Sequence, residues 1–287
     1  MTAHEGTPSP TSQKPDVGHP DFENGIDLAS LETALAGTRF ADKVRFFASI
    51  PSTNTHAMAE GEAGAPDGMV YVADEQTAGR GRGANAWASP PGTGLYVSVL
   101  LRPRIAPADA LWLSLAAGLA VHDSVERVTS LRADLRWPND LLLGRRKFCG
   151  ILSEMNAEVT RIRHMVIGIG INVLQQEFPA ELRDFATSMY IETGREWPRQ
   201  ELLGVLLKGL DHEVNSLTAT DGVEYGSKSI LERLEQASSW IRGKRVYVEG
   251  QDGYAGITEG LDARGFLLIR TASGLKTVYS GGVREQR

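Results

Sequence analysis

The sequence predicts an α+β protein in which helices pack on a mixed sheet and a small β-barrel follows at the C-terminal end. Two observations carry this prediction. Strand and helix patterns follow one another irregularly up to about residue 238, which argues against a doubly wound parallel sheet. Beyond that point short strands are separated by Gly-containing turns, as is typical of a small barrel. A chain of 287 residues is long enough to give both units a core.

The elements of the first unit follow from capping and periodicity. Asp27 caps a short helix whose Leu28, Leu31 and Leu35 share one face. Ser52-Thr53-Asn54 opens the next helix, either as ordinary capping residues or as polar groups that also grip a small polar ring. We expect strands over 43–49, 68–75, 94–101, around Leu135, 147–156 and 161–173, and helices over 27–37, 52–60, 107–128, 199–217 and 230–238. The barrel strands are expected over 244–249, 254–261, 266–270 and 276–280.

The N-terminal end has a different composition. It carries Pro8, Pro10, Pro15 and Pro20 among small polar residues, with too few large apolar side chains to bury, so we expect a disordered tail. Such a tail has no room for the two or three helices of a helix-turn-helix head. The sequence therefore predicts a disordered tail over 1–26, a main domain over 27–238 and a barrel over 239–287.

Charge and cysteine content limit the class of protein. The net charge is −6 at pH 7, whereas a protein devoted to nucleic acid normally presents a basic face. Cys149 is the only cysteine, so no intrachain disulfide forms, in keeping with a reducing cytoplasm. The sequence has neither a signal-peptide pattern nor an apolar run of membrane-spanning length. We expect a cytoplasmic protein with no DNA or membrane partner.

Residues 79–87 are the most informative motif and read Gly-Arg-Gly-Arg-Gly-Ala-Asn-Ala-Trp. The glycines let the backbone approach a ligand closely. Arg80 and Arg82 offer guanidinium groups to phosphate or carboxylate oxygens, and no acidic residue interrupts them. The motif predicts a loop that closes over an anionic ligand.

Two further motifs have a structural reading and a functional one, and each alone favours the structural reading. Trp137-Pro138-Asn139-Asp140 is a turn fixed by proline, or it presents Asp140 to Mg²⁺, which prefers oxygen ligands and substrate phosphates. Lys147 begins an apolar strand that contains Gly150. It is a solvated strand-end lysine, or a point charge that reaches a phosphate or a carboxylate. Cys149, which lies between Lys147 and Gly150, is expected to be a small core residue.

Residues 166–173, Val-Ile-Gly-Ile-Gly-Ile-Asn-Val, predict a buried strand interrupted by glycines. A dinucleotide-binding fingerprint would need a third glycine at Val173, so that interpretation fails. We expect Gly168 and its neighbours to permit close approach by a flat ring. Asn172 can donate and accept hydrogen bonds at a purine edge, or support a metal site.

Taken together, these motifs resemble the biotin–protein ligase (holocarboxylase synthetase) family over about residues 27–287. The resemblance implies a catalytic domain related to class II aminoacyl-tRNA synthetases over 27–238 and an SH3-like barrel over 239–287. The matching motifs are, in order, Ser-Thr-Asn at 52–54, Gln76, Gly-Arg-Gly-Arg at 79–82, Trp87, Trp-Pro-Asn-Asp at 137–140, Lys147 with Gly-Ile-Leu at 150–152, Gly-Ile-Gly-Ile-Asn at 168–172 and Ser-Gly-Gly at 280–282.

The resemblance implies a reaction in two steps. The carboxylate of biotin attacks the α-phosphate of Mg-ATP and gives biotinyl-5′-AMP and pyrophosphate. A lysine amine of the carrier domain of a biotin-dependent carboxylase then attacks the mixed anhydride and releases AMP. Because two anions must meet in the first step, cations that neutralise them in place fit this chemistry.

The resemblance also implies residue roles. It assigns none at Gly83, Ala84 and Asn85, where the loop departs from many bacterial members. The catalytic cations would be Lys147, Arg82 and Arg80, and Asp140 would be the Mg²⁺ ligand. The residues that bind biotin would be Ser52, Thr53, Asn54, Gln76, Gly79, Arg80, Gly81, Arg82, Trp87, Lys147 and Gly150. The residues that bind ATP would be Arg82, Asn139, Asp140, Lys147, Gly168 and Asn172.

Three alternatives remain. A lipoate–protein ligase shares the fold and the adenylation chemistry, but the Gly-Arg-Gly-Arg and Trp-Pro-Asn-Asp motifs favour biotin. The Pro-rich tail and acidic charge argue against a biotin-sensing repressor. Lys147, Asp140 and the two loop arginines argue against a binding protein without catalysis. The resemblance implies a homodimer, although no motif establishes it and none identifies the carrier protein.

Overall fold

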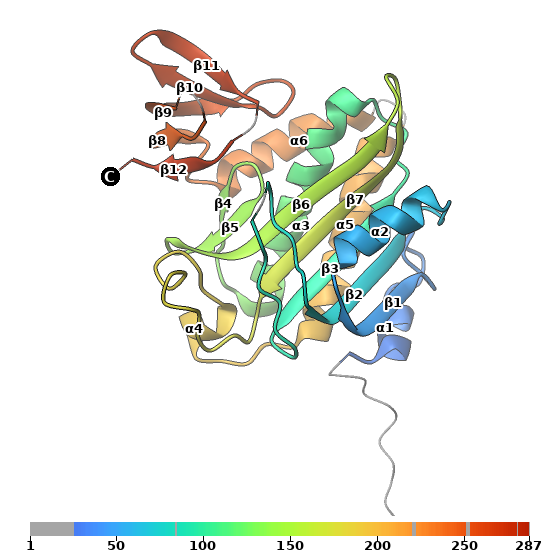
Figure 1. The fold of residues 1–287 in the computed structure, drawn as a ribbon. Coiled ribbons are helices and arrows are strands. Elements are labelled where there is room, and N and C mark those ends of the chain that lie inside the picture. Colours follow the sequence, from blue (N-terminus) through green and yellow to red (C-terminus); the bar gives the residue numbers. More distant parts are fainter. Residues whose placement is uncertain (1–25, 84, 220–221, 251–252, 280, 287) are drawn as a thin grey trace, which may run out of the picture.

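The computed structural model describes residues 26–83, 85–219, 222–250, 253–279 and 281–286. Within them a seven-stranded sheet has the order β1-β2-β3-β7-β6-β5-β4, and a five-stranded sheet has the order β11-β10-β9-β8-β12 (Figure 1). In the large sheet β1 and β2 are parallel, and the other neighbouring pairs are antiparallel. The predicted α+β class is confirmed, and so is the exclusion of a doubly wound parallel sheet.

The strands of the large sheet confirm the predicted ones, which differ by at most one residue at either end. One strand was not predicted: β5 has four residues and directly follows the Trp-Pro-Asn turn, so it is too short to show a period of its own. The strands are β1 (Val44–Ile50), β2 (Met69–Gln76), β3 (Gly94–Leu101), β4 (Asp134–Arg136), β5 (Asp140–Leu143), β6 (Arg146–Ala157) and β7 (Ile162–Asn172).

The helices also follow the predictions, except that α6 is longer and α4 is additional, and the predicted tail boundary differs by one residue. The side chain of Asp27 caps the first helix by accepting from Ser30 N at 3.2 Å, as expected. Ile26, assigned to the tail, is instead buried in the core; the rest of the predicted tail lies outside the described residues. α6 begins well before residue 230, and α4 was not predicted. The helices are α1 (Leu28–Ala34), α2 (Thr53–Glu62), α3 (Ala110–Thr129), preceded by a 3₁₀ turn at Pro107–Asp109, α4 (Met189–Thr193), α5 (Arg199–Thr218) and α6 (Gly222–Ala237).

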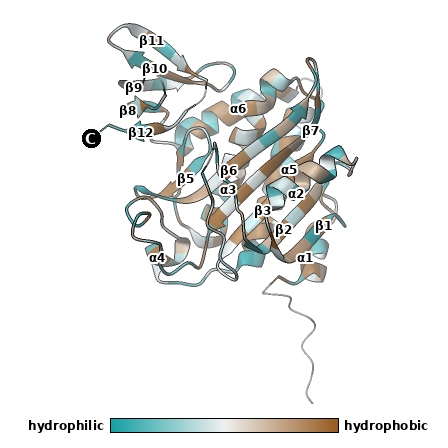
Figure 2. Cartoon of the chain, in the orientation of Figure 1, coloured by the Kyte–Doolittle hydropathy of each residue, from teal (hydrophilic) through white to brown (hydrophobic). Residues whose placement is uncertain are grey.

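The large sheet has differently covered faces. α3 and α5 pack on one another behind it, and α2 packs on β3 and β7 from the opposite face (Figure 1). The core lies between the sheet and α3, where Trp112, Leu113 and Leu115 are almost fully buried. Figure 2 shows the hydrophobic stretches of β3 and β7 that these helices cover. The α2 face, which is only partly covered, is the one that carries the site.

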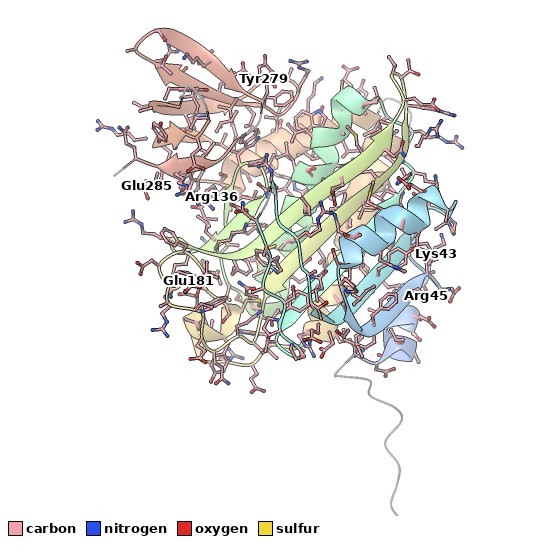
Figure 3. The ribbon with its side chains drawn as sticks, viewed as in Figure 1. Lys43, Arg45, Arg136, Glu181, Tyr279 and Glu285 are labelled. Carbon is pink, nitrogen blue, oxygen red and sulfur yellow. The ribbon has the colours of Figure 1, made fainter. Side chains whose placement is uncertain are left out.

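The C-terminal sheet is antiparallel throughout the described residues and packs beside the Trp137 turn. The indole Nε1 of Trp137 donates to Gly265 O at 2.9 Å, and Leu267 and Ile269 belong to the same hydrophobic cluster as the main core. Figure 3 labels Arg136 of β4 and Glu285 and Tyr279 of the C-terminal region, which lie in this part of the molecule. The strands are β8 (Arg242–Val248), β9 (Tyr254–Leu261), β10 (Leu267–Thr271), β11 (Gly274–Val278) and β12 (Val283–Glu285).

None of the described helices combines the length and the apolar character that a membrane crossing requires.

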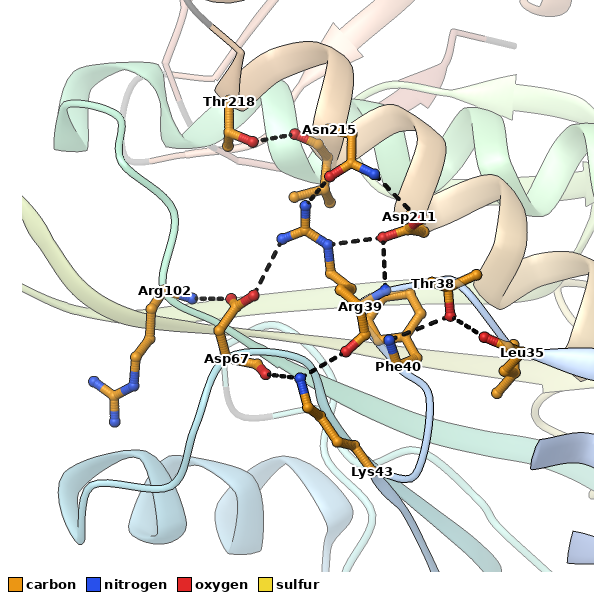
Figure 4. Close-up of polar contacts among 11 residues, drawn as sticks. Leu35, Thr38, Arg39, Phe40, Lys43, Asp67, Arg102, Asp211, Asn215 and Thr218 are labelled. Atoms are coloured by element: carbon orange, nitrogen blue, oxygen red, sulfur yellow. Dashed lines mark hydrogen bonds and ion pairs between the residues drawn. The ribbon is translucent and has the colours of Figure 1, made fainter. Parts of the chain in front are cut away.

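A polar cluster around Arg39 ties three distant segments together (Figure 4). The guanidinium of Arg39 donates to Asp211 on α5 at 2.9 Å and to Asp67, which precedes β2, at 3.3 Å, and it also bonds Asn215. Asp67 in turn accepts from Arg102 N at 2.7 Å, just after β3. The cluster therefore fastens α5 to the loops at one end of the sheet.

We predict that Arg39→Ala lowers the free energy of unfolding by about 2 kcal/mol, because Asp211 and Asp67 lose a partly buried charged partner. Urea unfolding measures this change. Lys228→Ala is the matched control, since Lys228 pairs with Glu224 at an exposed helical surface and should cost about 0.5 kcal/mol or less. Equal losses in the two variants would show that the cluster does not stabilise the fold.

Candidate active site

A cleft opens on the α2 face of the large sheet. Its floor is formed by β3, β6 and β7, one wall by the start of α2, and its cover by the loop after β2. Most of the residues predicted for the site line this one cleft. The lining residues are Ser52, Thr53, Asn54, Gln76, Arg80, Gly81, Arg82, Trp87, Tyr96, Val97, Ser98, Asn139, Lys147, Gly150, Ile151, Leu152, Gly168, Ile169 and Gly170.

The floor is bare of side chains where Trp87 lies on it. Gly150 of β6 and Gly170 of β7 are direct partners in the sheet. A Cβ added to Gly170 would lie 2.5 Å from Trp87 Nε1, and one added to Gly150 would lie 3.0 Å from Trp87 Cζ3. The indole therefore packs directly on the backbone of two strands, which only glycine at both positions permits. The flat ring that lies against these glycines is the protein's own Trp87.

Polar side chains from α2 and β2 line the other end of the cleft. Ser52 caps α2 by accepting from Thr55 N at 3.3 Å, so the capping interpretation is confirmed for that residue. Thr53 is buried and donates from N and Oγ1 to Gln76 Oε1, at 2.9 and 3.1 Å. Gln76 Nε2 donates to Ser89 Oγ at 2.9 Å. The motif thus both begins the helix and faces the cleft.

Asn54 is held in the same network. Its Oδ1 lies 3.0 Å from Ser98 Oγ of β3, and a Cβ added to Gly168 would lie 2.2 Å from that oxygen. Gly168, expected at the nucleotide, therefore makes room for Asn54. Ser98, which was not predicted, is also 2.8 Å from Thr53 Oγ1.

Lys147 lies beside Trp87 and is held by Asp140. Lys147 Nζ is 2.5 Å from Asp140 Oδ1 and 5.2 Å from the centre of the Trp87 ring, a cation–π distance. Its backbone is fixed as well, because Lys147 N donates to Phe185 O at 2.7 Å and Lys147 O accepts from Thr187 N at 2.9 Å. The ammonium is therefore placed within the cleft by both backbone and side-chain contacts.

Asp140 carries two cations. Arg136 donates to its second oxygen at 2.6 Å. Burial by itself raises the pKa of the Asp140 carboxyl, but the charges of Lys147 and Arg136 outweigh this desolvation and hold the pKa below its usual range. Asp140 is thus ionised at neutral pH and serves as the counterion of Lys147.

The sequence also predicted Asp140 as a Mg²⁺ ligand. Each oxygen of the carboxylate already faces a cation. In the part of the chain that the structure describes, no group of three or more His, Cys, Asp or Glu residues is arranged to hold a metal ion. In this structure the carboxylate is thus already paired with two cations, and its role as a Mg²⁺ ligand stays a prediction.

The loop arginines have different partners. Arg82 Nη1 donates to Asn139 Oδ1 at 3.0 Å, and Asn139 is anchored to β6 through Nδ2, which donates to Ile151 O at 2.9 Å. Arg80 instead makes a forked pair with Glu154 of β6, with both N–O distances 2.9 Å. In the contacts that the structure gives, the charge of Arg80 is therefore matched by a carboxylate. The charge of Arg82 is not, because its side-chain partner is the neutral amide of Asn139.

Three predicted site residues lie outside the cleft lining: Asp140, whose contacts are given above, and Asn172 and Gly79. Asn172 donates from Nδ2 to Thr187 O at 3.0 Å and accepts from Gln175 at 3.3 Å, so its amide is committed to the segment that holds the backbone of Lys147. Gly79 shapes the loop instead, because a Cβ there would lie 2.3 Å from Trp87 O. Neither Asn172 nor Gly79 meets the cleft directly.

Two polar residues at the site were missed: Ser98, which lines the cleft, and Glu154, which contacts the lining residues Asn54 and Arg80. Alternation along a strand places Ser98 on the face of Tyr96, and Glu154 on the face of Gly150 and Leu152. Each of these residues is polar and lies on the face of an apolar strand that also carries glycine. That pattern was the signal in the sequence that could have identified them as site residues.

Comparisons with known proteins agree with this geometry. The Biotin/lipoate A/B protein ligase family matches residues 46–172, and the Biotin protein ligase C terminal domain matches residues 242–283. The chain is 34% identical over 271 residues to the biotin–[acetyl-CoA-carboxylase] ligase of Mycobacterium tuberculosis, with 90% of this chain and 95% of that protein covered. It is 36% identical over 237 residues to the bifunctional ligase/repressor BirA of Bacillus spizizenii, with 82% and 71% covered.

A solved structure is similar over its whole length. The biotin protein ligase from Aquifex aeolicus, in complex with biotin and ATP, superposes with a TM-score of 0.73 at 32% identity, and 85% of this chain and all of that chain are covered. The fold and its cleft define a member of the biotin and lipoate ligase class. Within that class, the chain belongs to the biotin protein ligase family.

We predict that Gly170→Ala lifts Trp87 from the sheet and loosens the loop, because the new Cβ would collide with the indole. Trypsin cuts after arginine, so cleavage after Arg80 and Arg82 should become about tenfold faster, equivalent to about 1.4 kcal/mol of lost loop closure.

Gly209→Ala in α5 is the matched control, since its Cβ would meet Ala120 at an ordinary 3.6 Å. Unchanged cleavage in Gly170→Ala would mean that the Trp87 contact does not hold the loop.

Proposed function

We propose that this protein is an ATP-dependent biotin–protein ligase. A carboxylate oxygen of biotin attacks the α-phosphorus of ATP, the bond to pyrophosphate breaks, and biotinyl-5′-AMP forms. The amine of a carrier lysine then attacks the acyl carbon, AMP leaves, and an amide results. The observation that carries the proposal is the position of Lys147, which lies within one cleft beside an aromatic ring, a second cation and a polar pocket.

The first step needs positive charge where two anions meet. Lys147 and Arg82 line the same cleft and supply it without rearrangement, which is the form of electrostatic help that lowers such a barrier most. Asp140 holds Lys147 in place, and Asn139 holds Arg82. The substrates would arrive between two cations that are already positioned.

The two ends of the cleft suit the two ends of biotin. Trp87, packed on Gly150 and Gly170, would cover the apolar thiophane ring and valeryl chain with the rest of its ring. Thr53 and Gln76 would bond the polar ureido ring. The mixed anhydride hydrolyses in water, so the loop that carries Trp87 would protect it. No covalent enzyme intermediate is required, and Cys149 does not offer one, because complete burial raises the pKa of its thiol.

The partner that receives biotin is, in this proposal, the carrier domain of a biotin-dependent carboxylase. The protein would act in the cytoplasm, where a single buried cysteine stays reduced. A homodimer and the absence of DNA binding remain predictions from the sequence.

The proposal is tested by intact-mass spectrometry of a purified carrier domain incubated with this protein, ATP, Mg²⁺ and biotin. We expect one biotinyl group on one lysine, and none when ATP is omitted. A parallel incubation with lipoate separates the two ligase classes. Modification by lipoate in place of biotin would overturn the assignment.

We further predict that Lys147→Ala lowers biotinyl-AMP formation at least about a hundredfold, the scale of losing one preorganised electrostatic contact. Biotin-dependent exchange between ATP and pyrophosphate measures this step. Arg146→Ala removes the neighbouring cation, which pairs with Glu192 and does not line the cleft, and should stay within a few-fold of the wild type. A Lys147→Ala rate equal to that of the control would remove Lys147 from the mechanism.

A further inference from the structure

We infer that Glu154 is a positioning residue for this reaction: it clasps Arg80 and orients Asn54, and so fixes the loop over the cleft. The inference rests on the proposed function for its kinetic consequence, but the clasp itself is a property of the ligand-free protein. It assigns to Arg80 a role different from the direct grip on an anion that the sequence led us to expect.

The contacts of Glu154 occupy both of its oxygens. Arg80 Nη1 donates to Oε2 and Nη2 to Oε1, each at 2.9 Å, which is the forked geometry that makes arginine–carboxylate pairs strong and directional. Asn54 Nδ2 donates to Oε2 at 2.7 Å. One carboxylate on β6 therefore joins the loop after β2 to the first turn of α2.

The hydrogen bond from Asn54 to Glu154 fixes which way the Asn54 amide points, and so orients the hydrogen bonds that follow it. An amide group that donates to Glu154 must turn its oxygen away, and Asn54 Oδ1 accordingly faces Ser98 above Gly168. From there hydrogen bonds continue to the far end of the loop, since Ser89 Oγ donates to Trp87 O at 3.2 Å. The complete path is Arg80, Glu154, Asn54, Ser98, Thr53, Gln76, Ser89 and Trp87.

The two loop arginines therefore have separate tasks. The charge of Arg80 is matched by Glu154, whereas Arg82 bonds only the neutral oxygen of Asn139 in the contacts the structure gives. A guanidinium already held by a carboxylate would need to break two hydrogen bonds before it could bind a substrate anion. We conclude that Arg82 meets the substrates and that Arg80 acts through Glu154.

The clasp governs the loop and contributes little to the fold. The side chains of Arg80 and Glu154 are 44% and 27% exposed, and pairs at that exposure contribute little to global stability. The loop between β2 and Trp87 contains three glycines, whose ordering is entropically costly, so a small local interaction decides whether it is closed. Loss of the clasp should thus open the loop without unfolding the domain.

The test is a double-mutant cycle with Glu154→Gln, Arg80→Ala and both together. Hydrogen exchange of residues 79–87 is measured without ligands, and the KM for biotin and kcat are measured with a carrier domain. We expect each single variant to exchange about tenfold faster in the loop and to raise the KM for biotin about tenfold, with kcat within about threefold and the melting temperature unchanged. The double variant should be no worse than either single one.

Glu158→Gln is the matched control, because Glu158 makes an equally forked pair with Arg161 away from the cleft. It should leave both loop exchange and the KM unchanged. Loop exchange that is the same in Glu154→Gln and the wild type would overturn the clasp. So would an Arg80→Ala effect that persists in full in the Glu154→Gln background, since Arg80 would then bind the substrate directly. The loop-exchange result does not depend on the proposed function, which fails separately if the wild-type protein does not biotinylate a carrier.

Discussion

The contact between the Trp87 ring and the bare backbone of Gly150 and Gly170 is the constraint on which the rest of the site depends. Two adjacent strands must both omit a side chain at the same register for the indole to lie flat on them. This contact holds the end of the loop against the sheet and places the Trp87 ring next to the Lys147 ammonium. The apolar and the charged halves of the cleft are thus brought together by one contact.

The charges of the site are balanced before any substrate arrives. Asp140 partners Lys147 and Arg136, and Glu154 partners Arg80, so the cations can lie near one another without uncompensated repulsion. The difference between the two carboxylates lies in what they hold. In the proposed mechanism Asp140 fixes the cation that would meet the substrates, whereas Glu154 fixes the loop that would cover them. Arg82, held only by an amide, contributes the charge that is least satisfied without substrate.

Much of this could be predicted from the sequence because the signals were local. Strand periods located β1, β2, β3, β6 and β7, and the glycine and arginine motifs located the cleft lining. The short elements β5, β12 and α4 give no periodic signal and were missed. Partners in space were also out of reach: spacing alone does not show that Asp140 pairs with both Lys147 and Arg136.

Glu154 was missed because its partners are also distant in the sequence. Its partners Asn54 and Arg80 lie 100 and 74 residues away in the sequence, and only the fold brings the three together. Asn172, by contrast, stood in a recognised motif, yet its amide is turned to the segment that supports Lys147. A motif identifies which residues matter to a site, but the fold decides which of them face it.

The most direct test of the account is a crystal structure of the protein with biotin and ATP. The account predicts ligand in the cleft under the loop, with its phosphate or carboxylate oxygens at Lys147 and Arg82, and with Arg80 still paired to Glu154. Ligand bound anywhere else, such as the groove between α1 and α5, or Arg80 turned from Glu154 onto the ligand, would contradict it.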